Sequence, residues 1–557
     1  MTRKISSIDD LSITLNWDNQ LTAYLIRSCP YITLNVNNSK VKFKTIHAIL
    51  SVKIENQRCL IQLNNGQLWA FYTNNNNMAY TNTLNEIQMN INYTGILRIV
   101  LIPEPFDNNL KVIDQFYTSY PIGGIVNYEF PTSNQAYLHF NFKKGGSNLP
   151  LLMLALPHHI DCMINPSSNN LIGYNCLKGN LTAIISDQWT LYEELNNQIQ
   201  WFSNNPLNNN YINSITNALL QDINIEIDSN IKDPYFFGKG LAKIARLCLI
   251  AESVNKKELI SNLLIKIKKY IEPWLSGNNE NKFIYDNYWG GILTINGYDD
   301  SGADFGNGNY NDHHFHYGYF LYACAIIGKY DPGWVIWWRE PIQVLIRDFA
   351  SPSKNDIYFP QFRYKDWFDG HSWASGLFEF GDGKNQESTS ESVNAYYSMY
   401  LIAIILQNND LINISNLLLT SEIRSSKKYW HMTNNTSVYP VPFKNNKTVG
   451  VLWNTKVDYA TWFGKNVEFI HCIQMLPFTP ISHLLLDKQW VQECYPILST
   501  ALTRQDPPLS EGWKTFLFMA QAVFDKEKAV VNFNNSNKGM DDGNTLSNTL
   551  YWFATQQ

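Results

Sequence analysis

The sequence predicts a multidomain protein of α and β structure, with a β-sandwich-like region first and a helical toroid after it. A chain of 557 residues exceeds what one hydrophobic core usually fills, so two or three structural units are expected. Segments typical of strands dominate up to about residue 157, and longer segments typical of helices dominate after about residue 200. The change of pattern marks the passage from a β unit to a helical unit.

The β region is predicted from short apolar or alternating segments. Residues 11–15 alternate between apolar and polar side chains, residues 31–36 are rich in β-forming side chains, and residues 96–103 form a short, mostly apolar run that ends in proline. The pairs Asn65-Gly66 and Gly145-Gly146 are expected to supply turns.

The helical region is predicted from longer segments of apolar periodicity. The expected helices are 233–254, 258–274, 317–327, 335–349, 388–407, 460–475 and 511–525. Loops rich in glycine, asparagine and aromatic residues separate these segments. Because binding residues concentrate on loops held by a rigid scaffold, we expect a groove at one end of the toroid.

Composition favours a neutral partner such as a sugar. Charged residues make up 16% of the chain, and the net charge of -5 comes without a long run of one sign, which argues against nucleic acid and anionic membrane partners. Aromatic residues make up 14%, with 17 Trp and 32 Tyr, and their flat faces suit stacking on sugar rings as well as core packing.

Cysteine spacing and apolar run lengths exclude several other classes. The eight cysteines include no C-x-x-C pair, so neither a zinc site nor a disulfide framework is indicated. No apolar stretch is long enough to span a bilayer, and the first residues lack the apolar region of a signal peptide, so a soluble chain is expected.

The first polar-aromatic cluster is the run Asn-Asp-His-His-Phe-His-Tyr-Gly-Tyr at residues 311–319. In one interpretation Asp312 caps the following helix, or the three histidines bind a metal, although H-x-H spacing without H-E-x-x-H is a poor metal signal. In the other, apolar aromatic surroundings keep the proton of Asp312 near neutral pH, as a general acid requires, and neighbouring histidines orient it. The histidines are His313, His314 and His316, and the aromatic residues are Tyr310, Phe315 and Tyr317.

The second cluster, at residues 386–397, contains Glu387 and Glu391. Ser388 and Glu391 fit a capping box for the helix that follows, which explains Glu391 alone. Glutamates four residues apart repel each other on one helix face, at about 0.2–0.5 kcal/mol. Held together, they are also what activation of a water molecule needs, one as base and one to orient the water or tune the base. Both interpretations stay open at this point.

Two further segments indicate a groove. Residues 363–376 mix Trp and His with small residues in a way that no plain core element would, so a groove wall is expected there. Residues 456–464 run into an apolar segment that Pro477 and Pro480 stop, and a buried amphipathic helix accounts for its Ile and Met positions. Packing alone does not call for the polar residues of this stretch, which are Asp458, Tyr459, Glu468 and His471.

Four long motifs occur in order along the chain: residues 311–319, Gly370-His371-Ser372-Trp373-Ala374, Gln386-Glu387-Ser388-Thr389-Ser390-Glu391, and Phe469-Ile470-His471-x-Ile-Gln-Met-Leu-Pro. In these motifs the chain resembles glycoside hydrolase family 81, the inverting endo-β-1,3-glucanases. The likeness extends to residues 25–33, Leu156-Pro157-His158-His159, Phe237-Gly238-Lys239 and Leu550-Tyr551-Trp552, and so covers nearly the whole chain.

The resemblance implies three domains. Residues 1–157 would form an amino-terminal β-sandwich, residues 158–205 a small connecting α/β region, and residues 206–557 an (α/α)6 barrel that carries the groove. The chain departs from the family at its start, where the opening strands and signal peptide have no counterpart before Ile5, and at Cys472, where glycine is usual. We therefore expect a β-sandwich truncated at its start. The location stays open, because the family is usually extracellular and this chain carries no export signal.

By motif match, the resemblance gives Asp312 the role of general acid, with His316 in support. Glu387 or Glu391 would be the base that activates water, and the competing capping role of Glu391 favours Glu387. Inversion requires room for the water, so the acid and base carboxyls should stand roughly 6.5–9.5 Å apart. The residues expected to bind substrate are Tyr310, His313, Tyr317, Trp289, Tyr364, Trp367, His371, Trp373 and Asp458.

The leading hypothesis is an endo-acting, monomeric hydrolase of β-1,3-glucan that needs no metal or organic cofactor. The alternative from another class is a β-glucan-binding receptor, since an aromatic groove binds sugar even with its chemistry switched off. The intact Asp312, Glu387 and Glu391 favour the enzyme. A polysaccharide lyase on a similar toroid would need basic residues to neutralise a uronate, and Lys and Arg are sparse near the motifs.

Overall fold

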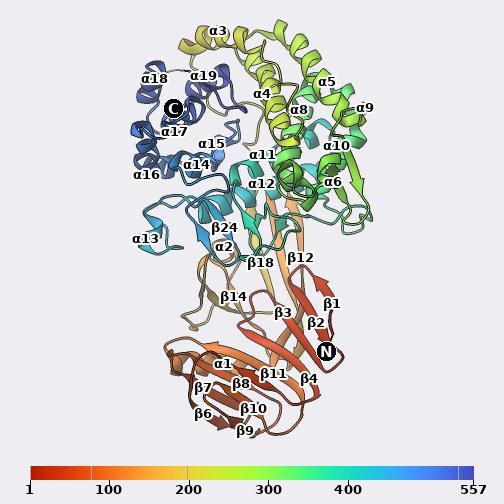
Figure 1. Cartoon of the computed structure of the whole chain (residues 1–557), viewed down its shortest axis with the longest axis vertical. Helices are drawn as coiled ribbons and strands as arrows, with labels where there is room; N and C mark the ends of the chain where they lie inside the picture. The colour runs from red at the N-terminus through yellow and green to blue at the C-terminus, as the bar shows by residue number, and fades with distance from the viewer. Residues whose placement is uncertain (1, 77, 197, 537) are drawn as a thin grey trace. The chain divides into compact units, whose positions relative to one another are not determined.

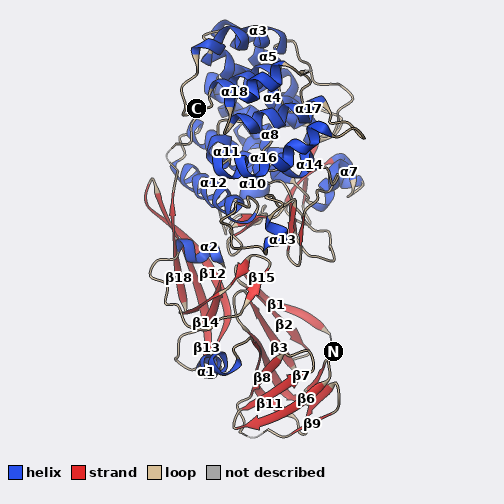
Figure 2. Cartoon of the chain, turned by 90° about the vertical axis from the view of Figure 1, so that its left-hand side faces the viewer, coloured by secondary structure: helices blue, strands red, loops and turns tan. Residues whose placement is uncertain are grey.

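The computed structural model describes residues 2–76, 78–196, 198–536 and 538–557. The chain forms two compact units, the first containing Met1–Glu194 and Trp367–Asp369, the second Leu195–Asp366 and Gly370–Gln557. Strands dominate the first unit and helices the second (Figure 1, Figure 2). The predicted order of a β-rich amino-terminal part and a helical carboxy-terminal part is therefore confirmed. Within the described ranges, no helix is both long and apolar enough to cross a membrane.

An antiparallel eight-stranded sheet with the order β1-β2-β3-β4-β11-β8-β7-β6 begins the first unit. Its strands are β1 (Arg3–Asp9), β2 (Ser12–Trp17), β3 (Leu21–Ile26), β4 (Tyr31–Ser39), β6 (Ile49–Glu55), β7 (Arg58–Leu63), β8 (Leu68–Tyr72) and β11 (Tyr93–Ile102). A small sheet of β5 (Lys42–Lys44), β10 (Glu86–Met89) and β9 (Tyr80–Asn82) shares a buried core with it. The strands expected at 11–15, 31–36 and 96–103 correspond to β2, β4 and β11.

The two predicted turns have different outcomes. Asn65-Gly66 lies in the turn between β7 and β8, as expected. Gly145-Gly146 is not a turn, because it ends strand β13 (Gln135–Gly146) and pairs with the start of β12 (Ser119–Thr132). The physical reason for glycine there is a close approach, since a Cβ at Gly146 would lie 2.1 Å from the carbonyl oxygen of Thr118.

In the remainder of the first unit, strands that precede residue 157, the predicted end of the β-sandwich, pair with strands that follow it. Strand β18 (Gln188–Glu194) pairs with β13, and β17 (Thr182–Ile185) pairs with β14 (Leu152–Ala155). Two helices, α1 (Phe106–Phe116) and α2 (Pro157–Cys162), and the short pair β15 (Asn175–Cys176) and β16 (Gly179–Asn180) complete it. The segment Trp367–Asp369 belongs to this unit, where Lys178 Nζ lies 2.6 Å from Asp369 Oδ1.

The second unit consists mainly of helices that contact their neighbours along the chain. They are α3 (Ile212–Asp222), α4 (Pro234–Ser253), α5 (Ile260–Ser276), α6 (Ile295–Asp299), α7 (Ala303–Gly306), α8 (His313–Tyr330), α9 (Pro332–Trp337), α10 (Arg339–Ala350), α11 (Thr389–Ile405), α12 (Asn409–Tyr429), α13 (Val441–Lys444), α14 (Val467–Cys472), α15 (Ser482–Leu485), α16 (Lys488–Leu498), α17 (Glu511–Ala522), α18 (Lys526–Asn534) and α19 (Leu546–Ala554). Short strand pairs lie between them, namely β19 (Phe283–Asp286) with β20 (Gly291–Thr294), β21 (Lys365–Asp366) with β22 (His371–Ser372), and β23 (Asn385–Gln386) with β24 (Val451–Trp453) and β25 (Val457–Asp458).

Most predicted helices are confirmed, and two differ. The helix expected at 335–349 is divided between α9 and α10. The helix expected at 460–475 is wrong for its first half, since only α14 is helical there. Residues 461–464 instead form a tight loop in which Thr461 and Gly464 pair with each other, and this loop contributes to the cavity described below.

Two central helices, α8 and α11, organise the second unit (Figure 1). Nearly every residue of both is buried, as expected for helices that are apolar on all sides. They pack so closely that a Cβ at Gly318 would lie 2.8 Å from the Cα of Ala395. The catalytic candidates Asp312 and Glu391 lie immediately before α8 and in the first turn of α11, so this packing brings them together.

We expect Gly318→Val to lower the free energy of unfolding by about 1–3 kcal/mol or more, because the added side chain forces α8 and α11 apart. Chemical denaturation followed by circular dichroism measures this change. Gly381→Ala is the matched control, since a Cβ there meets nothing within 4 Å. Equal stability of the two variants would contradict the importance of this contact.

Candidate active site

A cavity of about 680 Å³ lies in the second unit, at the ends of α8 and α11. All four predicted catalytic residues line it: Asp312, His316, Glu387 and Glu391. They come from two segments of the chain, one with Asp312 and His316 and the other with Glu387 and Glu391. His316 and Glu387 are 71 positions apart, so only the fold brings the two segments together.

Asp312 lies at the start of α8 with a positive φ of 59° and makes no side-chain cap to that helix, so the capping interpretation is wrong. Its main-chain N–H donates to the carbonyl oxygen of Ala374 at 2.9 Å. Burial, together with the nearby carboxylates of Glu387 and Glu391, raises the pKa of Asp312 well above its usual range. A raised pKa of this kind favours retention of the proton, which the predicted role of general acid needs.

The loop that carries Asp312 is held in an unusual backbone conformation. Positive φ values occur at Asp304, Phe305, Tyr310 and Asp312. Each costs about 1–3 kcal/mol and persists only where the surroundings impose it. Gly376 supplies part of that constraint, because its N–H donates to Asn311 Oδ1 at 2.9 Å and a Cβ there would lie 2.0 Å from the carbonyl oxygen of Asn309.

Glu387 follows strand β23 and is partly exposed to the cavity. Its Oε1 accepts a hydrogen bond from the main-chain N–H of Trp462 at 2.7 Å, and its carbonyl oxygen accepts one from Gln474 Nε2 at 2.6 Å. Burial raises the pKa of Glu387 to about 7, and the charge of Glu391 adds to this effect while the bond from Trp462 opposes it. A carboxyl group with this pKa can take up a proton near neutral pH.

Glu391 is buried in the first turn of α11. Ser388 caps this helix by accepting a hydrogen bond from the main-chain N–H of Glu391 at 3.3 Å, which is one half of the predicted capping box. The carboxylate of Glu391 accepts a bond from the hydroxyl of Tyr319 at 2.7 Å. Burial raises the pKa of Glu391, and the charge of Lys239 opposes this rise. Lys239 in turn lies 3.3 Å from Asp541 Oδ1.

His316 is a neutral, buried group beside the carboxylates. Burial lowers the pKa of His316 to about 3, so the ring is uncharged near neutral pH. Its ring centre lies 5.2 Å from that of Tyr235 and 6.2 Å from that of Phe305. Among the described residues, its Nδ1 has no hydrogen-bond partner.

The other two histidines of the first cluster face different partners. His313 Nδ1 lies 2.8 Å from Asp348 Oδ2, and its Nε2 lies 2.9 Å from the carbonyl oxygen of Asn307. His314 Nε2 lies 3.2 Å from Ser392 Oγ. In the part of the chain that the structure describes, no group of three or more His, Cys, Asp or Glu side chains could hold a metal ion.

Several predicted substrate-binding residues lie behind the cavity wall. The hydroxyl of Tyr364 donates to the carbonyl oxygen of Tyr310 at 2.7 Å, and that of Tyr317 donates to the carbonyl oxygen of Ile292 at 2.7 Å. Tyr310, His313, Tyr317 and Tyr364 are all buried. They hold the Asp312 loop in place from behind, and their direct contact with substrate stays a prediction.

The remaining predicted binding residues also lie outside the cavity lining. His371 and Trp373 are buried, with Trp373 Nε1 donating to Asp366 Oδ2 at 3.1 Å. Asp458 Oδ2 accepts a bond from Trp453 Nε1 at 3.0 Å. Trp367 belongs to the first unit, with its ring centre 6.0 Å from that of Tyr128, and Trp289 is half exposed on the β19–β20 hairpin.

The sequence analysis named Phe315 but missed the other aromatic residues that line the cavity. These are Tyr235, Phe236, Phe305, Phe380, Trp462, Phe463 and Trp513. One signal was available, because Trp462 and Phe463 form an adjacent aromatic pair directly before Gly464. The pair fell within the helix expected at 460–475, whereas it lies in a loop and both side chains are about half exposed.

Comparison with known proteins decides the family. Residues 1–206 match the glycosyl hydrolase family 81 N-terminal domain, and residues 206–553 match the glycosyl hydrolase family 81 C-terminal domain. The chain belongs to glycosyl hydrolase family 81. The resemblance found in the sequence motifs is thereby confirmed.

Curated proteins named as glucan endo-1,3-beta-D-glucosidases match most of the chain. A glucan endo-1,3-beta-D-glucosidase from Glycine max is 36% identical over 99% of this chain and 84% of its own length. One from Arthroderma benhamiae is 32% identical over 78% of this chain, and a primary septum glucan endo-1,3-beta-D-glucosidase from Schizosaccharomyces pombe is 28% identical over 97%. The chain spans about half the length of these two fungal relatives, 50% and 55%.

A solved family 81 structure from Clostridium thermocellum has the same fold. It superposes with a TM-score of 0.84 at 22% identity, covering 99% of this chain and 77% of that one.

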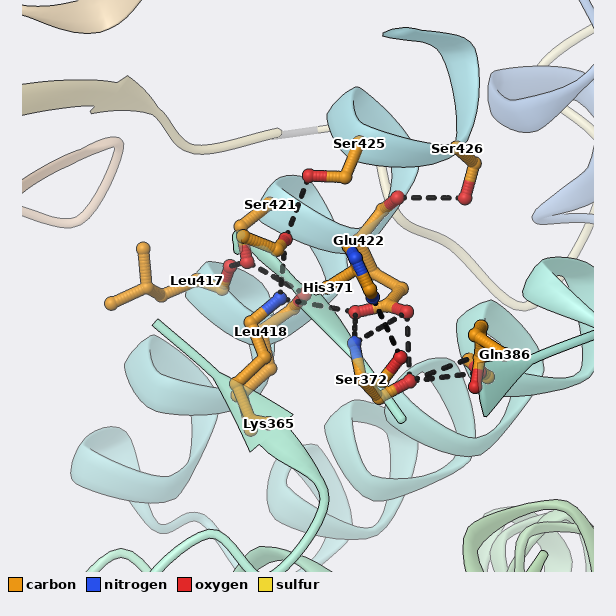
Figure 3. Close-up of polar contacts among 12 residues, drawn as sticks. Lys365, His371, Ser372, Gln386, Leu417, Leu418, Ser421, Glu422, Ser425 and Ser426 are labelled. Carbon is orange, nitrogen blue, oxygen red and sulfur yellow. Dashed lines mark hydrogen bonds and ion pairs between the residues drawn. The ribbon is translucent and has the colours of Figure 1, made fainter. Parts of the chain in front are cut away.

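A buried polar network reaches the segment that carries Glu387 in this family 81 chain (Figure 3). At its centre Glu422, on α12, accepts hydrogen bonds from Lys365 Nζ at 3.0 Å and from Ser372 Oγ at 2.8 Å. Ser372 Oγ lies 3.0 Å from Ser392 Oγ, which accepts a bond from Gln386 Nε2 at 2.6 Å. Gln386 directly precedes Glu387, so the network reaches the backbone of the second catalytic cluster.

We expect Glu422→Gln to lower the free energy of unfolding by about 3–5 kcal/mol, because it leaves the buried charge of Lys365 without its partner. Chemical denaturation measures this change. Asp487→Asn is the matched control, since its ion pair with Lys427 is exposed and should contribute less than about 1 kcal/mol. A double variant, Lys365→Met with Glu422→Leu, should regain much of the lost free energy of unfolding. If Glu422→Gln loses no more stability than Asp487→Asn, the role of the pair is refuted.

Proposed function

We propose that this glycosyl hydrolase cleaves β-1,3-glucosidic bonds within β-1,3-glucan, with inversion of the anomeric configuration. The observation that carries the proposal is the cavity lined by Asp312, Glu387 and Glu391 together with exposed aromatic side chains. A glycosidase needs a proton donor and a water-activating carboxylate, and aromatic faces suit sugar rings. The name of the soybean relative, which matches 99% of this chain, supports the same bond and substrate.

In the proposed mechanism Asp312 donates its proton to the glycosidic oxygen as the bond to the leaving sugar breaks. The raised pKa of Asp312, which burial and two neighbouring carboxylates produce, supports this role. Neutral His316 supports the acid, since it supplies polarity beside Asp312 without a positive charge that would favour loss of the proton.

We assign the general base to Glu387. The Trp462 amide engages one of its carboxylate oxygens, which leaves Oε2 for the attacking water. Glu391 is less suited, because it is buried, accepts the Tyr319 hydroxyl and lies close to Lys239. In this assignment the carboxylate of Glu391 tunes its two neighbours by raising the pKa of Asp312 and of Glu387.

For the fold, we propose the finer arrangement of a β-sandwich in residues 1–157, a connecting region in 158–205 and an (α/α)6 barrel in 206–557. The serial contacts of α4 with α5 and α8, and of α11 with α8 and α12, support a barrel of paired helices. The pairing of β18 with β13 ties the connecting region closely to the strands before it. We further propose that the chain acts as a monomer on β-1,3-glucan.

The decisive experiment is an NMR time course of the protein with a soluble linear β-1,3-glucan. New reducing ends should appear first as the α-anomer, because water attacks from the face opposite the leaving group. Asp312→Asn should reduce turnover by a factor of at least about 100 while oligosaccharide binding persists. Initial β-anomer would overturn inversion, and saturable binding without cleavage would favour a receptor.

Glu387→Gln and Glu391→Gln separate the base from its neighbour. Added azide should restore turnover only in Glu387→Gln and give the α-glycosyl azide, since azide replaces the activated water. In the wild type, kcat/KM should rise with pH through the pKa of Glu387 of about 7, because the base must lose its proton to act. Azide rescue of Glu391→Gln instead would transfer the base role to Glu391.

A further inference from the structure

A group of exposed aromatic side chains lies on the β19–β20 hairpin, outside the cavity lining. The hairpin tip carries Tyr288 and Trp289, with exposed fractions of 85% and 50%, and the adjacent loop carries Tyr358 at 55%. The Tyr288 and Trp289 ring centres are 5.4 Å apart at 77°. We call Tyr285, Tyr288, Trp289 and Tyr358 the hairpin platform. Large aromatic residues left in contact with water at one place usually mark a binding surface.

The hairpin platform is rigidly held, although its rings are exposed. Arg363 Nη2 donates to the carbonyl oxygens of Trp289 at 3.2 Å and Gly290 at 2.5 Å. The hydroxyl of Tyr285 donates to the carbonyl oxygen of Tyr358 at 2.5 Å. A Cβ at Gly290, where φ is +63°, would lie 2.6 Å from that same oxygen, so the tip packs directly against the adjacent loop. A preorganised surface loses little entropy when it binds a ligand.

The charged groups beside the platform are engaged by other residues, and the Arg363 guanidinium at its tip donates to main-chain carbonyls. Asp286 is buried and accepts bonds from the Tyr310 hydroxyl and the Tyr288 N–H, both at 2.8 Å. Asp356 is neutralised by Arg347, with Oδ1 and Nη2 2.7 Å apart. Exposed rings with hydroxyl and indole N–H groups at their edges suit a neutral sugar chain better than an ionic partner.

From these observations we propose that the hairpin platform binds a stretch of β-1,3-glucan chain outside the catalytic cavity. This proposal rests on the proposed function for the identity of the polysaccharide. The bond from Tyr310 to Asp286 links the hairpin to the loop that carries Asp312, so the two sites belong to one rigid part of the second unit. A polysaccharide chain held at the platform has a raised local concentration at the cavity. A short oligosaccharide cannot contact both places and gains no such advantage.

The test compares a double variant, Tyr288→Ala with Trp289→Ala, with the wild type on a long linear β-1,3-glucan and on a short oligosaccharide. We expect the ratio of kcat/KM on polymer to kcat/KM on oligosaccharide to fall about three- to tenfold. Native electrophoresis in gels containing the soluble polymer should show weaker retardation of the double variant. Trp337→Ala is the matched control, because Trp337 is 81% exposed but ends α9 and is not part of the hairpin platform.

The outcomes separate this proposal from the proposed function. If the wild type cleaves neither substrate, the proposed function fails, and loss of retardation in the double variant still supports the hairpin platform. An unchanged ratio with unchanged retardation overturns the platform. Equal losses on both substrates also overturn it, because they place the residues in the cavity. If a soluble β-1,4-glucan retards the wild type and the β-1,3-glucan does not, the identity of the ligand is overturned. The same holds if the double variant abolishes binding to a protein instead of a glucan.

Discussion

The close packing of α8 against α11 is the constraint on which the site depends. Gly318 allows the backbones of these helices to approach, and Asp312 and Glu391 lie at their amino-terminal ends. Because both helices are buried along nearly their whole length, neither can slide without opening the core of the second unit. The catalytic geometry is therefore set by helix packing, and the loops that carry the carboxylates only complete it.

The cavity concentrates negative charge with little compensation. Five carboxyl groups line it, those of Asp312, Glu387, Glu391, Asp541 and Asp542, and Lys239 is the one Lys or Arg among its described lining residues. Burial and mutual repulsion favour protonation of some of these groups, whereas Lys239 favours ionisation of the nearest. Different surroundings thus separate the protonation states of chemically similar groups, which is what acid and base catalysis in one site requires.

The sequence was a good guide to the carboxyl groups that line the cavity and a poor one to its aromatic wall. Asp312 and Glu387 stand in dense polar clusters that packing does not explain, so they were found. Tyr364 and Trp373 look like sugar-stacking residues in the sequence, yet they are buried behind the site, because an aromatic residue serves a core or a groove equally well. Trp462 was missed because its loop folds back onto Glu387, which is 75 residues away, and the adjacent aromatic pair with Phe463 does not reveal that contact.

The bond between Glu387 and residue 462 comes from the main chain, not from the indole ring. Two tasks therefore meet at one position: the peptide N–H holds a carboxylate, and the side chain forms part of the cavity wall and donates from Nε1 to Asn385 Oδ1 at 3.3 Å. Every amino acid except proline keeps that N–H. Position 462 can therefore vary in size and polarity over evolutionary time, or in the hands of a protein engineer, and reshape the wall while the carboxylate keeps its anchor.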